Sequence, residues 1–335
     1  MSRRAIFGFS ALLLSALAAP FLAGLSRMAG ADPGLLLDQA GALSQLRAVA
    51  IWQGGREVAA RGYRGFDPDR ATNIKSASKS VISALAGIAI ARGLFSGADQ
   101  KVAAILRRDL PPDPDPRMND LTLGHLLSMQ AGLQRQSGPA YGRWVGSRNW
   151  VRAALDVPFE QDPGQGMQYS TASTHLVSAM LTQASGRSTL DLARDWLGGI
   201  PGFAIASWQR DPQGVYLGGN EMAMSTRSLL AFGAAYAAGG QGVIPPGWIA
   251  ESWVPRTRSV FSGEAYGYGW FVSEAGGRPV RYGWGYGGQM IYVFPPARGL
   301  PAAAIAMTSD PGQPSGRTGY RQQLHALAGA LVRAV

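Results

Sequence analysis

Ser76 and Lys79 are the residues whose types and spacing most clearly predict chemistry. They lie in a stretch from 73 to 92 that reads as a loop followed by a helix starting near Ser76, and residues three apart share a helix face. A serine becomes an effective nucleophile when a neighbouring base takes its proton, and a desolvated lysine can be that base. The pair therefore predicts acyl transfer through a serine. The alternative is that Ser76, Ser78 and Ser80 only cap the helix.

The lysine of this pair is unusual for the chain. Only three of the 31 basic residues are lysines, at positions 75, 79 and 101. After Lys79 the predicted helix is apolar almost all round, which is typical of a buried helix. A buried ammonium is costly unless it has a use, and arginine, unlike lysine, does not give up its proton at neutral pH. We therefore expect Lys79 to be a group that must lose its proton.

Tyr169 opens a second informative stretch. A loop rich in proline and glycine precedes Tyr169-Ser170-Thr171, and an amphipathic helix is expected from there to residue 183. Its inward face should hold Leu176, Met180 and Leu181. A tyrosine at such a junction is often only a packing residue, but its hydroxyl could also lie beside Ser76 and Lys79 as a proton relay.

Residues 282–289 read Tyr-Gly-Trp-Gly-Tyr-Gly-Gly-Gln, which is an unusual composition for a strand. Glycines inside a strand mark the close approach of another backbone or of a ligand. A backbone N–H group at such a strand edge, here that of Tyr286, could supply half of an oxyanion hole. Gly285 would permit the close approach.

The elements that must position these residues follow a simple order of strands, then helices, then strands. A hairpin is expected over Gln45–Tyr63, and short helices and loops follow from 95 to 148. Further helices are expected at 189–196, 225–238 and 324–332, and strands at 266–274, 279–286, 289–294 and 302–309. The close spacing of the last strands favours an antiparallel meander. This order predicts an α+β protein with a mostly helical part over about 95–240.

Composition excludes several classes of site and partner. The 335 residues are 46% hydrophobic, and the chain contains no cysteine, so it has neither disulfides nor thiolate chemistry. The net charge is +10, but no basic run with interleaved aromatics predicts nucleic-acid binding. Asp113 and Asp115 alternate with proline and indicate a solvated loop rather than a metal site. His125 lies in a helical apolar context and is expected to be structural. We expect no metal or cofactor.

Residues 1–31 resemble an export signal. Arg3 and Arg4 form a basic start, residues 5–25 are apolar, and small residues follow. The start also resembles a twin-arginine signal, which carries folded proteins across a bacterial inner membrane. The alternative is an uncleaved helix over 5–25 that associates with the membrane. Either way, the domain over 32–335 is expected in the periplasm or facing it.

Taken in order, the three motifs resemble those of the serine β-lactamase and penicillin-binding-protein superfamily, over roughly residues 40–333. Within it, the branch of class C β-lactamases, esterases and aminohexanoate-dimer hydrolases looks closest. The resemblance implies a β-lactamase/transpeptidase-like fold, an antiparallel sheet flanked by helices. It implies an acyl-enzyme on Ser76, with Lys79 and Tyr169 sharing the base role and the N–H groups of Ser76 and Tyr286 forming the oxyanion hole. Further substrate contacts are expected from Thr171, Trp284 and Gly285.

Two departures from the family pattern narrow the expected substrate. Thr171 replaces the usual asparagine, and Gly283-Trp284-Gly285 carries no lysine or histidine. Both changes argue against an efficient β-lactamase or D-Ala peptidase and favour hydrolysis of a small, neutral ester or amide. Arg281, on the same strand face as Gly283, could replace the missing cation. A true β-lactamase or D-Ala peptidase, a non-hydrolytic sensor or structural protein, and a binder of anionic surfaces stay open as alternatives. The oligomeric state is left open.

Overall fold

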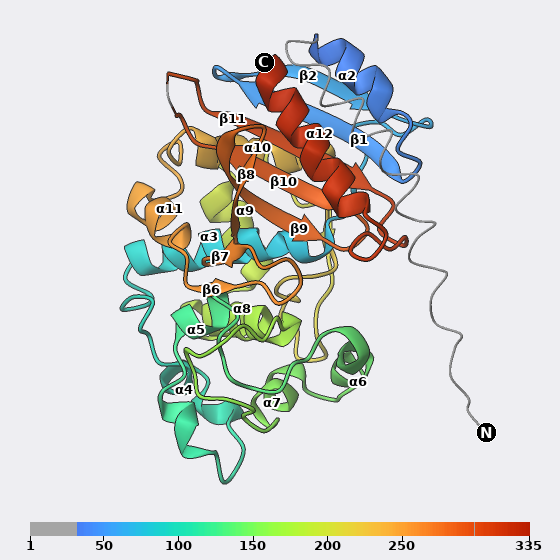
Figure 1. Ribbon diagram of the computed structural model, residues 1–335. Coiled ribbons are helices and arrows are strands. Elements are labelled where there is room, and N and C mark those ends of the chain that lie inside the picture. The colour runs from blue at the N-terminus through green and yellow to red at the C-terminus, as the bar shows by residue number, and fades with distance from the viewer. Residues whose placement is uncertain (1–31, 298) are drawn as a thin grey trace, which may run out of the picture.

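The computed structural model describes residues 32–297 and 299–335, so the predicted export signal or anchor lies outside the described residues. Strands from both ends of this range form one eight-stranded antiparallel sheet, in the order β2-β1-β11-β10-β9-β8-β7-β6 (Figure 1). Its strands are β1 Leu46–Gln53, β2 Arg56–Gly62, β6 Thr257–Arg258, β7 Ala265–Tyr266, β8 Phe271–Ala275, β9 Arg278–Gly285, β10 Gln289–Phe294 and β11 Ala303–Ser309. The predicted hairpin and meander are confirmed.

Helices cover both faces of this sheet. The central strands β10 and β11 are buried along their whole length, as continuous apolar strands between two layers should be. On one face lie α2 (Pro33–Ala40) and α12 (Tyr320–Ala334), and on the other lie α10 (Thr226–Ala237) and α3 (Ser78–Ala91) (Figure 1). The sheet thus separates two apolar cores. The predicted α+β class, a sheet flanked by helices, is confirmed.

The middle of the chain is mostly helical, with a small three-stranded sheet in the order β3-β5-β4. Its helices are α4 Val102–Ile105, α5 Leu123–Leu127, α6 Tyr141–Val145, α7 Trp150–Leu155, α8 Thr171–Ser185 and α9 Thr189–Leu197, with α11 Pro246–Ser252 following α10. The small strands are β3 Thr72–Asn73, β4 Ser207–Trp208 and β5 Met222–Met224. In the described part, no helix is long and apolar enough to cross a membrane.

Two elements differ from the expectation in an instructive way. The predicted amphipathic helix is α8, and every residue from Thr171 to Leu181 is buried, because other helices surround it. Thr174, His175 and Ser178 on its buried faces form hydrogen bonds within the protein. The strand expected over 266–274 is two strands, split where Ser80 Oγ donates a hydrogen bond to the Gly269 carbonyl at 2.7 Å.

His125 has a structural role, as expected, and Asp115, expected in a solvated loop, has one as well. Asp115 caps a 3-10 turn at residues 116–119 and forms an ion pair with Arg117 at 2.7 Å. His125 and Thr122 form a capping box at the start of α5, in which the Thr122 N–H donates to His125 Nδ1 at 3.3 Å. Burial lowers the pKa of His125, which favours this neutral, hydrogen-bonded form.

Candidate active site

Ser76 lies in a one-turn 3-10 helix, Lys75–Ala77, that leads directly into α3. The helix was predicted to start near Ser76, and the α-helical part begins two residues later. The Ser76 side chain faces a cavity of about 430 Å³. That cavity is lined by Lys75, Ser76, Arg135, Ser137, Gly138, Tyr141, Tyr169, Thr171, Asn220, Glu221, Phe261, Trp284 and Tyr286. Five of the residues singled out from the sequence therefore meet at one cavity: Ser76, Tyr169, Thr171, Trp284 and Tyr286.

Lys79 lies directly beneath Ser76, one helical turn along, and is fully buried. Its Nζ atom donates to Ser76 Oγ at 3.1 Å and to the Gly219 carbonyl oxygen at 2.8 Å, with Thr171 Oγ1 at 3.4 Å. Among the described residues, no carboxylate lies within ion-pair distance of this amine. Burial lowers the pKa of Lys79 from 10.5 to about 7. A neutral amine is therefore available at neutral pH beside the Ser76 hydroxyl.

Tyr169 and Thr171 reach the same place from the start of α8. The Tyr169 ring lies 5.1 Å from Lys79 Nζ. Burial raises the pKa of Tyr169 to about 12, against smaller lowering effects from the Ser76 hydroxyl and Arg135. At neutral pH this phenol carries its proton. Thr171 Oγ1 also lies 3.0 Å from Ser137 Oγ, so a chain of hydroxyl groups connects Lys79 to the cavity wall.

The end of β9 packs against residues 74–77, the turn that carries Ser76 and is called the nucleophile turn. A Cβ atom on Gly285 would lie 2.2 Å from the Ile74 carbonyl oxygen, and one on Gly283 would lie 2.8 Å from Ser80 Oγ. The glycines are thus required for close backbone approach, as the sequence indicated. Tyr286 follows directly, with its side chain half exposed at the cavity wall. Within the described residues, no protein acceptor is recorded for its N–H group.

Two residues that line the cavity, Lys75 and Glu221, have an unusual backbone conformation. Lys75 and Glu221 have φ angles of 51° and 50°, a left-handed conformation that is unusual for residues other than glycine. Their side chains form an ion pair at 3.0 Å, and Glu221 also accepts from Asn73 Nδ2 at 2.6 Å. Such strain persists only where surrounding contacts fix it, and it gathers at functional sites. This ion pair fixes the turn that carries Ser76.

Sequence reasoning did not identify several cavity residues. Arg135 donates from Nε to the Tyr169 carbonyl oxygen at 2.9 Å, and its guanidinium lies 5.2 Å from the Phe261 ring centre. In the part of the chain that the structure describes, Arg135 has no ion-pair partner. Asn220 Nδ2 donates to the Tyr141 hydroxyl at 2.9 Å. These residues lie on separate loops without periodicity or a local motif, so no signal in the sequence marked them.

The third motif was expected to lack a cation that an arginine elsewhere could replace, and the arginine that lines the cavity is Arg135. Arg281, named as the nearest substitute, does share a strand face with Gly283, but its guanidinium lies 5.6 Å from the Trp253 ring centre and does not line the cavity. Tyr282 and Tyr292, on β9 and β10, do not line the cavity. Both are instead buried in the other core, on the α12 side of the sheet. The aromatic lining comes from Tyr141, Tyr169, Phe261, Trp284 and Tyr286.

This arrangement has the parts that acyl transfer requires. A hydroxyl faces a cavity, a buried amine with a lowered pKa lies within hydrogen-bond distance of it, and a protonated phenol stands beside both. Tyr286, whose N–H group has no hydrogen-bond acceptor among the described residues, lines the same cavity. The geometry fits a serine nucleophile with an amine base.

Comparisons with known proteins agree with this geometry. The family model described as Beta-lactamase matches residues 41–328 of the chain. A curated relative named for fimbrial assembly, FimD of serogroup H1 from Dichelobacter nodosus, is 29% identical over 160 residues. That match takes in 44% of this chain and only 40% of the relative's length.

Solved structures share the fold at low identity. A protein assigned as a 6-aminohexanoate-dimer hydrolase from Bacillus anthracis superposes with a TM-score of 0.71 at 14% identity, covering 88% of this chain and 81% of that one. The hydrolase EstCE1, described as having promiscuous acyltransferase activity, gives a TM-score of 0.69 at 18% identity, covering 94% and 100%. A penicillin-binding protein homologue from Pyrococcus abyssi gives 0.64 at 17%, covering 87% and 76%. At such identities these likenesses establish the fold alone.

Proposed function

Because the chain belongs to the Beta-lactamase family, whose model matches residues 41–328, we propose that it is a serine hydrolase that forms an acyl-enzyme on Ser76. Its substrate in this proposal is a small ester or amide. The observation that carries the proposal is the pairing of Ser76 Oγ with Lys79 Nζ at 3.1 Å, since that amine is fully buried and its pKa is lowered to about 7. Structural packing alone would not require a lysine there.

In the proposed reaction, Ser76 Oγ attacks the substrate carbonyl carbon and its proton passes to Lys79. That proton then passes from Lys79 to the leaving group, with the Tyr169 hydroxyl, which is protonated at neutral pH, as the relay between them. Water then attacks the acyl-enzyme by the reverse proton path. The N–H groups of Ser76 and Tyr286 would stabilise the oxyanion, with the Gly285 backbone holding the strand end close to the nucleophile turn.

The cavity supports a substrate of modest size. Its volume of about 430 Å³ and its aromatic walls suit a compact acyl group. Arg135 offers a guanidinium whose position is fixed by the Tyr169 carbonyl and the Phe261 ring. An anionic group on the substrate would find its partner there, so a carboxylate-bearing ester or amide is compatible with this site as well as a neutral one.

An ester assay with a matched variant tests the proposal. The wild-type chain should turn over p-nitrophenyl acetate many times, and Ser76→Ala should abolish this while losing no more than about 1 kcal/mol of stability. Turnover at the wild-type level in Ser76→Ala would contradict the assignment of the nucleophile. A single stoichiometric burst in the wild type would instead favour the non-hydrolytic sensor.

A further inference from the structure

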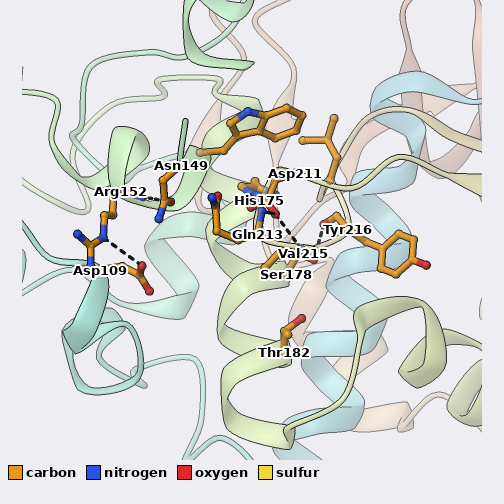
Figure 2. Close-up of polar contacts among 12 residues, drawn as sticks. Asp109, Asn149, Arg152, His175, Ser178, Thr182, Asp211, Gln213, Val215 and Tyr216 are labelled. Atoms are coloured by element: carbon orange, nitrogen blue, oxygen red, sulfur yellow. Dashed lines mark hydrogen bonds and ion pairs between the residues drawn. The ribbon is translucent and has the colours of Figure 1, made fainter. Parts of the chain in front are cut away.

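His175 and Asp211 form a fully buried pair that the proposed reaction does not use. His175 lies on α8, one turn after Thr171, and its Nε2 is 3.1 Å from Asp211 Oδ2, with both side chains inaccessible to solvent (Figure 2). The rings of Trp144 and Trp150 pack edge-on against the imidazole, with centres 5.5 and 5.7 Å away. His175 Nδ1 has no hydrogen-bond partner among the described residues. The imidazole is therefore held by the carboxylate and by two indole rings.

The second oxygen of Asp211 organises the loop that follows it. Asp211 Oδ1 accepts hydrogen bonds from the N–H groups of Gln213 and Val215, both at 2.8 Å (Figure 2). The carboxylate thus binds the loop through one oxygen and α8 through the other. A buried polar group needs such hydrogen bonds, and both oxygen atoms of Asp211 have them.

Two further hydrogen bonds attach the rest of this segment to α8. Ser178 Oγ donates to the Tyr216 carbonyl oxygen at 2.6 Å, and Thr174 Oγ1 donates to the Gly218 carbonyl oxygen at 3.0 Å. Ser178, Asp211 and Tyr216 lie close together along one side of α8 (Figure 2). Residues 211, 216 and 218 are therefore attached to α8 over positions 174–178.

The same segment ends as a cover over Lys79. Gly218 is so close to α8 that a Cβ atom on it would lie 2.0 Å from the Thr174 carbonyl oxygen. Gly219, with a φ angle of 86°, is so close to the lysine that a Cβ atom on it would lie 2.9 Å from Lys79 Nζ. Its carbonyl oxygen accepts the 2.8 Å hydrogen bond from that atom. Water is excluded from this side of the amine by backbone rather than by a side chain.

We propose that His175 and Asp211 are positioning residues, whose pair holds residues 211–219 against α8 and so keeps the Gly218–Gly219 backbone over Lys79. In that position the segment keeps the amine dry and directs it toward Ser76. This inference rests on the proposed function for its catalytic consequence, but its structural content concerns Lys79 alone. The groups that face the lysine amine are Ser76, Thr171, Tyr169 and the Gly219 carbonyl. None of these described neighbours is a carboxylate that would raise the pKa of the amine.

Asp211→Asn is the sharpest test, because the amide has nearly the same shape. Its single oxygen can accept from the loop N–H groups or from His175, but not from both. If the oxygen stays with the loop, the amide N–H₂ faces His175 Nε2 and forces the imidazole proton onto Nδ1, which has no acceptor. The segment should loosen, water should reach Lys79, and the pKa of the lysine should rise.

The direct measurement is a pH titration of the chain labelled with ¹³C at lysine Cε. Only three lysines give signals, and the Lys79 signal is identified by its loss in Lys79→Arg. The wild-type midpoint should lie near 7, and in Asp211→Asn it should rise by about one unit, since desolvation is the cause of the lowered value. Ester acylation at pH 7 should then fall about fivefold and recover toward the wild-type rate at pH 9. A purely structural role would lower the rate equally at both pH values.

Two variants complete the design. Thr308→Val removes another buried hydrogen bond, that between Thr226 and Thr308 at 2.6 Å, and should lower stability without moving the Lys79 midpoint. Ser178→Ala removes the hydrogen bond to the Tyr216 carbonyl oxygen and should raise the Lys79 midpoint by less than Asp211→Asn does. If Asp211→Asn does not fold, the Lys79 midpoint in Ser178→Ala is the test of the inference.

An unchanged midpoint in the folded variant would overturn the inference. The titration needs no turnover, so the two proposals can fail separately. If the wild type shows no hydrolase activity but the Lys79 midpoint still rises in Asp211→Asn, the proposed function is wrong and the positioning role of His175 and Asp211 stands.

Discussion

At the scale of single residues, the account depends on the environment of Lys79. Three oxygen atoms surround its amine, belonging to Ser76, Thr171 and Gly219, and all of them are neutral. Desolvation is therefore not offset by a carboxylate, and the pKa falls to about 7. A lysine that needed only to be a fixed charge would be stabilised by an acidic partner. This one is held where it can release its proton.

Lys79→Arg should be nearly as damaging as Lys79→Ala, although it keeps the positive charge. Arginine does not give up its proton at neutral pH, so the base would be lost. We expect kcat for a nitrophenyl ester to fall at least about a hundredfold in both variants. An arginine variant with near wild-type kcat would show that position 79 serves only as a charge.

The pH dependence of acylation should follow the same amine. Wild-type acylation should rise with pH through a midpoint near 7, as Lys79 loses its proton, because the neutral amine is the base. The Tyr169 phenol should stay protonated throughout that range, since its pKa is about 12. Stopped-flow measurement of nitrophenolate release between pH 5 and 9 tests this. A rate that falls with pH across 7 would contradict it.

Arg135 is the residue expected to set preference for an anionic substrate. Replacing it by methionine keeps the packing against Phe261 and removes the guanidinium. We expect KM for an ester with a free carboxylate on its acyl group to rise about tenfold or more, and KM for the matching neutral ester to change little. Equal effects on both esters would show that Arg135 only supports the Tyr169 carbonyl.

At the scale of elements, β9 and the turn before α3 form the site by their close contact. The strand end can approach the Ile74 carbonyl because Gly285 has no side chain. The periodicity of the sequence predicted both elements, and the glycines predicted that something approaches them. The glycines do not identify their contact partner. That partner, the 3-10 turn, lies more than two hundred residues earlier in the chain.

Gly285→Ala tests this contact directly. The added methyl group would lie 2.2 Å from the Ile74 carbonyl oxygen, so the strand end or the nucleophile turn must move. We expect a loss of about 1–3 kcal/mol in unfolding free energy and a larger relative loss in kcat than in KM. Gly247→Ala in α11 is the control, because its methyl group would meet nothing within 4 Å. Full activity in Gly285→Ala would mean that the strand end does not shape the site.

At the scale of the whole molecule, the sequence predicted the class and order of elements well and the assembly of the cavity only in part. β10 has the predicted bounds, Gln289–Phe294, because turn residues flank a short apolar run. α2 was missed, although Asp32 and Pro33 are a good helix start. Ser76, Lys79 and Tyr169, which the structure brings together, could be singled out because each stands in a local motif. Arg135 and Glu221 were not, because only the tertiary fold brings their loops together.

A buried lysine with a lowered pKa also makes the stability of the whole chain depend on pH. Below pH 7 the folded state must carry a buried ammonium or lose a proton that the unfolded chain keeps, so folding is penalised. Between about 7 and 10.5 the unfolded chain holds more protons, and stability should rise with pH by about 4 kcal/mol from this residue.

Lys79→Met isolates that effect. Its unfolding free energy at pH 7, measured by urea denaturation, should exceed that of the wild type, and the difference should shrink as the pH approaches 10. Other titrating groups affect both proteins alike and cancel in the difference. A difference that does not vary with pH would show that Lys79 keeps its ordinary pKa in the folded chain.

The central claim, that Ser76 forms the acyl-enzyme, is tested most directly by locating the acyl group. The chain is quenched in acid during reaction with a nitrophenyl ester, and its intact mass and peptide map are measured. We predict one added acyl group on a peptide that contains Ser76, retained in Ser78→Ala, whose hydroxyl donates instead to the Lys75 carbonyl at 2.7 Å, and lost in Ser76→Ala. An adduct on another residue, or one that survives in Ser76→Ala, would contradict the account.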